Sequence, residues 1–118
     1  DCKVYGTEPE GADDAYQSFK SGKLVPQVNP NTIADGLLTS LGSLNFEIIR
    51  EKVQDILLVN DIEIKAAMRL IWERMKIIIE PSCAVPLAAV LRNKNLFKGK
   101  KVGIILSGGN VDLANVKW

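Results

Sequence analysis

Residues 101–110, KVGIILSGGN, decide the fold, because an apolar run of strand composition leads directly into a glycine-rich turn. The run at 101–106 is apolar on both faces, which is the pattern of a central parallel strand that helices cover on both sides. The turn at 107–110 would then lie at the carboxyl end of that strand, where open α/β sheets bind ligands. By itself the turn could cradle a phosphate or could simply lead the chain out of the sheet, and both interpretations stay open here.

Outward from this segment, the chain alternates short strands with helices, which is typical of an α/β layer architecture. We expect strands at 3–7, 55–59 and 101–106, helices at 12–21, 32–41, 45–52 and 87–91, a loop at 25–31 and a surface connection at 92–101. Three strands make a thin sheet, because parallel sheets normally have both faces covered and their edges protected. Further strands are therefore expected from chain outside these residues.

The clearest helix of the sequence follows Asn60, which has capping-box spacing to Glu63. Apolar residues recur there at intervals of four and three, so they share one face of the helix. These residues are Ile64, Met68, Ile71, Met75 and Ile78. Pro81 is expected to end this helix and Pro86 to begin the next one, because proline is favoured in the first helical turn.

The composition excludes several classes of function. The chain has 118 residues and a formal net charge of +1, with no basic block, so the electrostatic footprint of a nucleic-acid-binding protein is missing. It has no histidine, which excludes from these residues a histidine general base, a Ser-His-Asp triad and a histidine-ligated zinc. No apolar run approaches the length of about 20 residues that crosses a bilayer, so no membrane partner is expected.

The two cysteines, Cys2 and Cys83, lie far apart and form no metal-binding motif. We interpret them as free thiols in a reducing compartment, which predicts a cytoplasmic protein. Cys83 could act as a nucleophile, but a small buried thiol is the simpler interpretation, since no base accompanies it. The chain begins with Asp1 and has no signal-peptide pattern, and we expect residues 1–118 to form a single segment of a longer protein.

Acidic side chains gather at 8–14, where the sequence EPEGADD follows the first expected strand. Carboxylate oxygens near a glycine-containing turn suit a hard cation such as Mg²⁺ or Ca²⁺. They also suit an ordinary helix start, since the helix dipole stabilises acidic groups near a helix N-terminus.

Two further acidic residues lie elsewhere in the chain. Glu80 follows an apolar run and is expected to be partly buried with a perturbed pKa. Asp35 lies between small residues, and composition alone does not distinguish it from a turn residue.

Four segments taken together resemble one enzyme family: VYGTEPEGADDAYQS, NTIADGL, IKAAMRLIWERMKIIIEPS and VGIILSGGNVDL. In this order and spacing they are similar to the serine racemase and threonine/serine dehydratase group of fold-type II pyridoxal-phosphate enzymes. The resemblance covers nearly all of the chain. It implies the C-terminal part of the large, cofactor-binding domain of a tryptophan synthase β-like fold, with a mostly parallel sheet flanked by helices.

The resemblance assigns a cofactor contact and a cation site. Ser107 matches the serine that hydrogen-bonds the pyridine nitrogen of pyridoxal 5'-phosphate, so the turn is expected to contact the ring nitrogen instead of cradling the phosphate. Glu8, the backbone carbonyl of Ala12, and Asp14 match a divalent-cation site. Mg²⁺ or Ca²⁺, with Mn²⁺ as a further candidate, would occupy it together with water ligands.

Four other residues match positions around the active site of the family. Asp35 and Glu80 match acidic positions near the pocket and are expected to give electrostatic support only. Lys76 and Asn110 match positions at which nucleotide-responsive members contact ATP at a dimer interface. The resemblance therefore also implies a homodimer and an ATP effector. Residues 82–84 depart from the glycine-containing version that is common in the family.

The function that the resemblance implies is racemisation or dehydration of a small hydroxy amino acid, such as serine or threonine, through a Cα carbanion. The lysine that forms the Schiff base with the cofactor is expected to lie outside this chain, so the isolated chain is expected to be inactive. Two alternatives remain. One is a truncated, non-catalytic relative that serves as a scaffold or partner-binding module, and the other is another enzyme of the same fold, such as threonine synthase.

Overall fold

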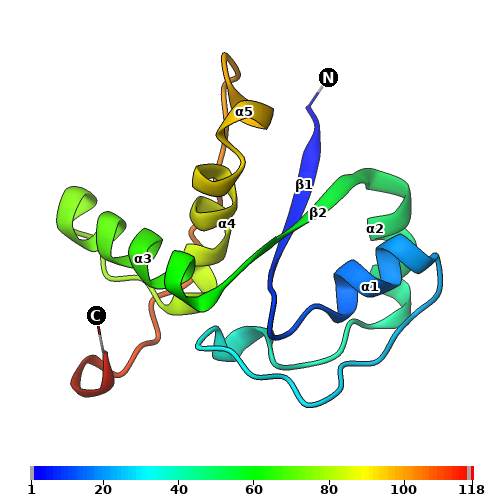
Figure 1. The fold of residues 1–118 in the computed structure, drawn as a ribbon, viewed down its shortest axis with the longest axis horizontal. Helices are drawn as coiled ribbons and strands as arrows, with labels where there is room; N and C mark the ends of the chain where they lie inside the picture. Colours follow the sequence, from blue (N-terminus) through cyan, green and yellow to red (C-terminus); the bar gives the residue numbers. More distant parts are fainter. Residues whose placement is uncertain (1, 117) are drawn as a thin grey trace.

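The computed structural model describes residues 2–116 and residue 118, and it has an α/β arrangement around a short parallel sheet (Figure 1). Strand β1 (Val4–Pro9) pairs in parallel with strand β2 (Val53–Val59), with Gly6 opposite Ile56 and Glu8 opposite Leu58. The helices are α1 (Asp14–Ser21), α2 (Ser43–Lys52), α3 (Asp61–Met75), α4 (Pro81–Arg92) and α5 (Lys94–Phe97), with short 3-10 helices η1 (Asp35–Leu37) and η2 (Leu113–Asn115).

The helices lie on both sides of the strand pair. Helices α1 and α2 contact β2 and each other on one side, and α4 contacts both strands on the other, with α3 packed beyond it (Figure 1). This is the layered arrangement that the alternation of strands and helices predicts. Among the described residues no helix is long and apolar enough to cross a membrane.

Most of the buried apolar core lies between α3 and α4. Helix α3 contributes Ile64, Met68 and Ile71, all of them buried, from the face that the sequence predicts. Helix α4 contributes mainly small side chains, which allow two helix backbones to approach closely. The members of this cluster are Ala34, Val59, Ile64, Ala67, Met68, Ile71, Ile79, Cys83, Ala84, Val85, Ala88 and Ala89.

Several predicted elements are confirmed. The first two strands, α1 and α2 occur within a few residues of the predicted bounds. Helix α1 ends at Gly22, whose backbone is left-handed with φ 71°, a conformation that glycine adopts without steric cost. The capping box of α3 is complete, since the Glu63 N–H donates to the Asn60 side chain (3.0 Å) and the Asn60 N–H donates to the Glu63 carboxylate (2.9 Å).

The predicted end of α3 is wrong. The helix ends at Met75, and Lys76 takes a left-handed conformation with φ 59°. The indole N–H of Trp72 then donates to the carbonyl of Ile79 (3.0 Å), which folds the following segment back against the helix. Met75 and Ile78, predicted on the buried face, are consequently about half exposed, while Ile79 is buried.

The predicted start of the next helix is also wrong. Helix α4 begins at Pro81, and Pro86 lies inside it. A proline is tolerated at the first helical position because its missing N–H would have no partner there. Pro81 therefore starts α4 where the sequence pattern suggested that it ended α3.

The predicted helix at 32–41 is reduced to the single turn η1. Three of its backbone N–H groups donate to side chains of other elements: Ile33 to Asp61 (3.1 Å), Gly36 to Ser82 (3.0 Å) and Leu41 to Asp14 (2.6 Å). These bonds replace the carbonyl partners that a longer helix would need.

The predicted strand at 101–106 does not form in the described part of the chain. A strand needs a neighbour for its backbone hydrogen bonds, and β1 and β2 pair with each other instead. Leu106 packs against the core cluster, but the side chain of Ile105 is 81% exposed. The sheet therefore has two strands in place of the three predicted.

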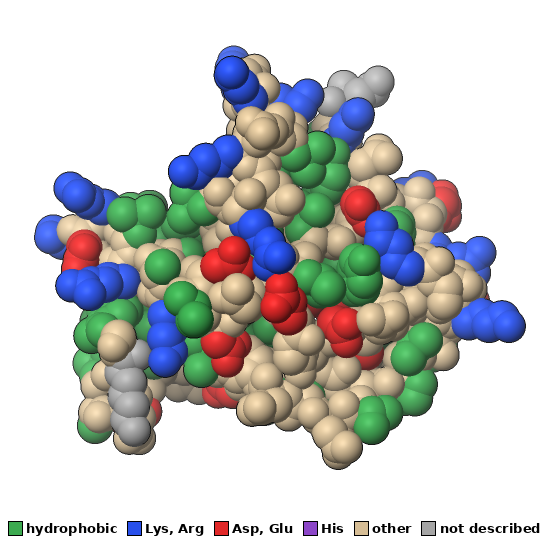
Figure 2. All heavy atoms as spheres, in the orientation of Figure 1, with side chains coloured by type: hydrophobic (Ala, Val, Ile, Leu, Met, Phe, Trp, Pro, Cys, Tyr) green, Lys and Arg blue, Asp and Glu red, His purple; other side chains and the backbone are tan. Residues whose placement is uncertain are grey.

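The basic stretch at 92–101 lies at the surface, as predicted. Lys94, Lys98, Lys100 and Lys101 are all exposed, and Figure 2 shows basic side chains gathered over α5 at one end of the molecule. The two thiols are free, with Cys2 exposed and Cys83 buried. That residues 1–118 form one segment of a longer protein stays a prediction.

Candidate functional site

Three segments that are far apart in sequence meet at the N-terminus of α4. The N–H of Glu80 donates to the carbonyl of Gly108 (3.2 Å), which joins the turn at 107–109 to the start of the helix. The N–H of Gly36 donates to the hydroxyl of Ser82 (3.0 Å), which joins η1 to the same first turn. The structure thus brings Asp35, Glu80 and the turn that carries Ser107 to one place.

The two glycines of this turn lie in close contact with the residues that precede α4. A Cβ atom on Gly108 would lie 2.5 Å from Oε1 of Glu80, and one on Gly109 would lie 2.6 Å from the carbonyl oxygen of Ile78. Real Cβ atoms do not approach other heavy atoms so closely. A larger residue at 109 would therefore push the turn away from the backbone of Ile78, whereas one at 108 would displace the end of the Glu80 side chain. The glycine-rich turn is therefore seated directly on residues 78–80, a close packing that sequence reasoning did not identify.

Ser107, the predicted cofactor contact, is exposed at the edge of this group. Its hydroxyl makes no hydrogen bond to any residue that the structure describes. A hydroxyl can donate one hydrogen bond and accept others. Ser107 can therefore serve a group from outside the chain.

The predicted cation ligands lie together in a second place, where β1 leads into α1. Glu8 is at the end of the strand, Ala12 is buried, and Asp14 is the first residue of the helix and only 3% exposed. The carboxylate of Glu8 accepts the N–H of Tyr16 (2.8 Å), and that of Asp14 accepts the N–H of Leu41 (2.6 Å).

The electrostatics of Glu8 are unusual. The pKa of its carboxyl is raised from 4.5 to about 7, mainly by burial and to a smaller extent by the negative charges of Asp14 and Asp13. The hydrogen bond from the backbone of Tyr16 opposes this rise.

Within residues 2–116 and 118, no group of three or more cysteine, aspartate or glutamate side chains is placed to hold a metal ion. The predicted set contains two carboxylates and one backbone carbonyl, so water would have to complete the coordination.

The two predicted nucleotide contacts, Lys76 and Asn110, are less closely associated with each other than the predicted cation ligands are. Lys76 is exposed at the end of α3 and donates to the carbonyl of Glu73 (2.7 Å). Asn110 is also exposed and lines a cavity of about 340 Å³ together with Asp35, Lys65 and Pro81. No hydrogen bond joins Lys76 to Asn110 in the portion of the chain described.

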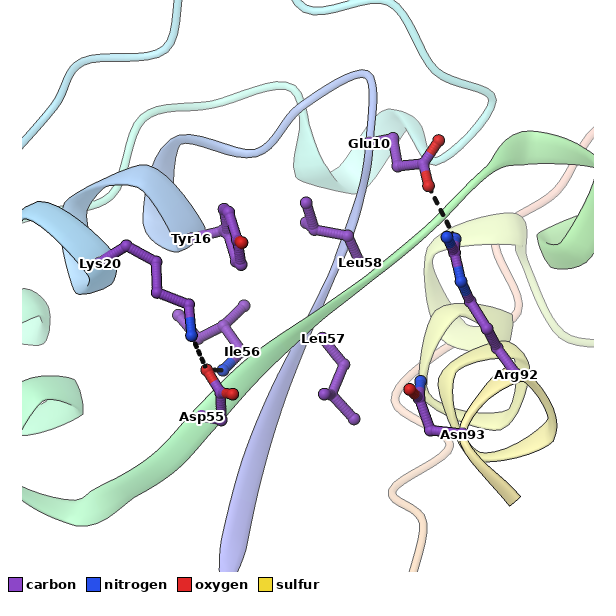
Figure 3. Close-up of a pocket in the computed structure, with 9 residues that line it drawn as sticks. All are labelled: Glu10, Tyr16, Lys20, Asp55, Ile56, Leu57, Leu58, Arg92 and Asn93. Carbon is purple, nitrogen blue, oxygen red and sulfur yellow. Dashed lines mark hydrogen bonds and ion pairs between the residues drawn. The ribbon is translucent and has the colours of Figure 1, made fainter. Parts of the chain in front are cut away.

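A further hollow, of about 370 Å³, surrounds the middle of β2 (Figure 3). Its charged side chains are paired with one another: Lys20 with Asp55 (2.7 Å), and Arg92 with Glu10 (2.7 Å) and Glu63 (3.0 Å). The hydrogen bond from Lys20, with that from the Ile56 backbone, lowers the pKa of Asp55 against the opposing effect of burial. Because these charged groups already pair with one another, they are less available to bind a ligand than the groups at the N-terminus of α4.

Comparison with known proteins identifies the family. The family model described as "Pyridoxal-phosphate dependent enzyme" matches residues 1–108. The chain belongs to this family. The fold and the resemblance predicted from the sequence are thereby confirmed.

Similar proteins of this pyridoxal-phosphate family are known from several organisms. The chain is 57% identical to the serine racemase of Dictyostelium discoideum, over 97% of this chain and 36% of that protein. It is 48% identical to the beta-hydroxyaspartate dehydratase of Paracoccus denitrificans, over 100% of this chain and 38% of that protein. The chain therefore spans little more than a third of the length of these relatives.

Solved structures of the family superpose on the chain. The serine racemase of Dictyostelium discoideum gives a TM-score of 0.85 at 59% identity, over 94% of this chain and 36% of that one. Maize serine racemase gives 0.89 at 42% identity, over 95% of this chain and 36% of that one.

Proposed function

We propose that the full-length protein removes the Cα proton of a small hydroxy amino acid with the aid of pyridoxal 5'-phosphate, and so racemises or dehydrates it. The observation that carries this proposal is the seating of the turn at 107–109 on Glu80, with Asp35 joined to the same helix terminus. Relatives named serine racemase and beta-hydroxyaspartate dehydratase support the substrate class.

The residues of the turn fit the cofactor of the family. Ser107 presents a hydroxyl without an internal partner in the described chain, which suits the pyridine nitrogen of the ring. The bound cofactor would supply an electron-withdrawing system that stabilises negative charge at the substrate Cα. Ser107 would hold the ring through a neutral hydrogen bond, which leaves the ring nitrogen largely unprotonated and favours racemisation and elimination over transamination.

Asp35 and Glu80 would act on the electrostatics of the same pocket. Glu80 is the residue before the first turn of α4, where the exposed N–H groups of a helix favour negative charge. The Asp35 segment is bonded to that turn through Gly36 and Ser82. Both carboxyl groups would therefore lie close to the proposed ring site and give electrostatic support without acting on the substrate directly.

We further propose that Glu8, the carbonyl of Ala12, and Asp14 bind Mg²⁺ or Ca²⁺, with Mn²⁺ as a third candidate. The raised pKa of Glu8 supports this, because partial burial, and to a smaller extent the nearby Asp14, disfavours the negative charge of Glu8, and a divalent cation would offset both effects. All of the proposed ligands are oxygen atoms, as these cations prefer.

Three finer proposals concern the whole protein. It would form a homodimer, respond to ATP through Lys76 and Asn110, and work in the cytoplasm. The free thiols of Cys2 and Cys83 agree with a reducing compartment. Neither nucleic acid nor membrane is a proposed partner.

The function is tested with the full-length protein, pyridoxal 5'-phosphate and L-serine, L-threonine or hydroxyaspartate, by measuring keto acid and the D-enantiomer. Cofactor-dependent turnover of one of these substrates is expected. Failure on all three would instead support a non-catalytic scaffold or an enzyme with a different substrate, such as a threonine synthase.

The cofactor contact is tested separately with Ser107→Ala. Because the hydroxyl is the proposed partner of the ring nitrogen, the loss of about one hydrogen bond should weaken cofactor binding roughly fivefold to tenfold. Absorbance titration measures the affinity. Ser43→Ala is the matched control, since Ser43 is also exposed and its hydroxyl bonds to no described residue. Equal affinity for Ser107→Ala and wild type would remove Ser107 from the site.

A further inference from the structure

The segment at 35–41 is held at both ends by side chains of other elements. At one end, the N–H of Gly36 donates to the hydroxyl of Ser82 on α4 (3.0 Å). At the other, the N–H of Leu41 donates to the carboxylate of Asp14 on α1 (2.6 Å). The segment has too little regular structure to fix itself, since only η1 is helical. Its position therefore depends on these contacts.

The contact with Ser82 is unusually close. A Cβ atom on Gly36 would lie 2.9 Å from the Ser82 hydroxyl oxygen and 3.4 Å from its Cβ, so a larger residue at 36 would displace this hydroxyl from the backbone. The same Gly36 N–H also lies 3.0 Å from Oδ1 of Asp35. One amide thus faces both the Ser82 hydroxyl and the Asp35 carboxylate, which brings these two side chains to a common point.

Ser82 is also well placed relative to the turn that carries Ser107. It is the second residue of α4, and the residue that caps this helix, Glu80, bonds to Gly108 through its backbone N–H (3.2 Å). The first turn of one rigid helix therefore binds the Asp35 segment on one side and the Ser107 turn on another. The distance between Asp35 and the turn is set through α4.

We infer that Ser82 is a positioning residue for the proposed reaction. Its hydroxyl fixes the backbone of Gly36 and thereby holds the Asp35 carboxylate at a set place beside the Ser107 turn. In this role Ser82 would act through Gly36 and Asp35 and not through a contact of its own with the cofactor or the substrate. This inference rests on the proposed function for its catalytic consequence, but the contact itself can be tested without it.

The first test concerns the contact. In the full-length protein with cofactor, Ser82→Ala removes one of the two acceptors of the Gly36 N–H and leaves only Asp35. The Gly36 amide should therefore exchange its hydrogen up to about fivefold faster, the ratio expected for one neutral hydrogen bond. Ser82→Thr keeps the hydroxyl and should retain the wild-type exchange rate. Ser43→Ala, a hydroxyl removed from the first residue of another helix, should change nothing at Gly36.

The second test concerns the role. Ser82→Ala should displace Asp35 but leave the Ser107 turn in place. It should therefore raise KM for the amino acid about fivefold, while the cofactor affinity measured by absorbance titration stays as in wild type. Ser82→Thr should restore KM. This pattern differs from that of Ser107→Ala, which acts on cofactor binding.

The outcomes separate the two ideas. Unchanged exchange at Gly36 in Ser82→Ala would overturn the inference whatever the activity. Faster exchange with an unchanged KM in an active enzyme would also overturn it, because the contact would then have no catalytic consequence. An inactive wild type whose Gly36 exchange still depends on Ser82 would reject the proposed function and leave the structural link standing.

Discussion

The carboxyl of Glu8 illustrates how one residue can oppose the stability of its own fold. Burial and the neighbouring Asp14 disfavour its charge, and the hydrogen bond from Tyr16 compensates only in part, so its pKa rises to about 7. A partly buried carboxyl whose ionisation is disfavoured is commonly a binding residue, since a ligand of opposite charge favours the ionised form. The sequence identified this acidic segment, but its ordinary helix-start role could be weighed only once burial was known.

The titration of Glu8 gives a prediction with a definite sign. Between pH 4.5 and about 7 the folded protein holds a proton on Glu8 that the unfolded chain has lost, so its contribution to stability falls as the pH rises through this range. In full-length protein freed of divalent cations, Glu8→Gln should therefore raise the Tm by about 2–4 °C at pH 8. At pH 5 it should have little effect. Thermal unfolding at the two pH values measures this.

The exposed Glu47 of α2 supplies the control, because Glu47→Gln should leave the Tm nearly unchanged at both pH values. Added Mg²⁺ or Ca²⁺ should stabilise wild type more than Glu8→Gln. A Tm that falls equally at pH 5 and pH 8 in Glu8→Gln would contradict the assignment, since it would mean that the carboxylate stabilises the fold when ionised.

At the scale of elements, the sequence predicted those whose signals are local. The capping box of α3 and the glycine at the end of α1 are set by neighbouring residues, and both are confirmed. The 32–41 helix was lost because its N–H groups bond to Ser82, Asp14 and Asp61, which are distant in sequence. The proline at 81 was misassigned because a proline is compatible with both the end of one helix and the start of another.

The seating of the turn at 107–109 makes a prediction about two adjacent glycines. Gly109→Ala would force a Cβ against the backbone oxygen of Ile78, which cannot move without shifting the chain, so it should destabilise the protein by about 1–3 kcal/mol. Gly108→Ala would meet only the flexible end of Glu80 and should cost less. Urea unfolding of the 118-residue chain measures both.

The control for this pair is Gly103→Ala, because a Cβ atom at Gly103 meets nothing within 4 Å in the described chain. It should leave the unfolding free energy of the 118-residue chain unchanged. If Gly109→Ala were as mild as Gly103→Ala there, the turn would not be seated on Ile78 in the way the structure indicates.

At the scale of the whole molecule, the proposed site would be only partly contained in this chain. The sequence placed Asp35, Glu80 and Ser107 in one pocket by resemblance, and the structure brings their segments together at the start of α4. It could not reveal Ser82, because no local pattern marks a serine that bonds to a glycine 46 residues earlier. The chain also spans only 36% of the serine racemase of Dictyostelium discoideum, so residues from the remaining length would complete the proposed site.

The strand that the sequence predicted at 101–106 gives the last prediction. Val102 and Ile105 are exposed, and the segment has no strand partner in the described residues, yet its composition is that of a fully buried strand. Each strand of a two-stranded sheet also has one unpaired edge, which proteins normally cover. We therefore expect residues 102–106 to pair with a strand from the rest of the full-length protein.

The backbone amides of residues 102–106 should then exchange their hydrogens roughly tenfold more slowly in the full-length protein than in the 118-residue chain, which corresponds to about 1.4 kcal/mol of protection. The amides of α3, already bonded within their own helix, serve as the internal reference for both proteins. Equal exchange at 102–106 in the two proteins would mean that this apolar segment stays unpaired, and the sheet would then have to be completed at the free edges of β1 and β2 alone.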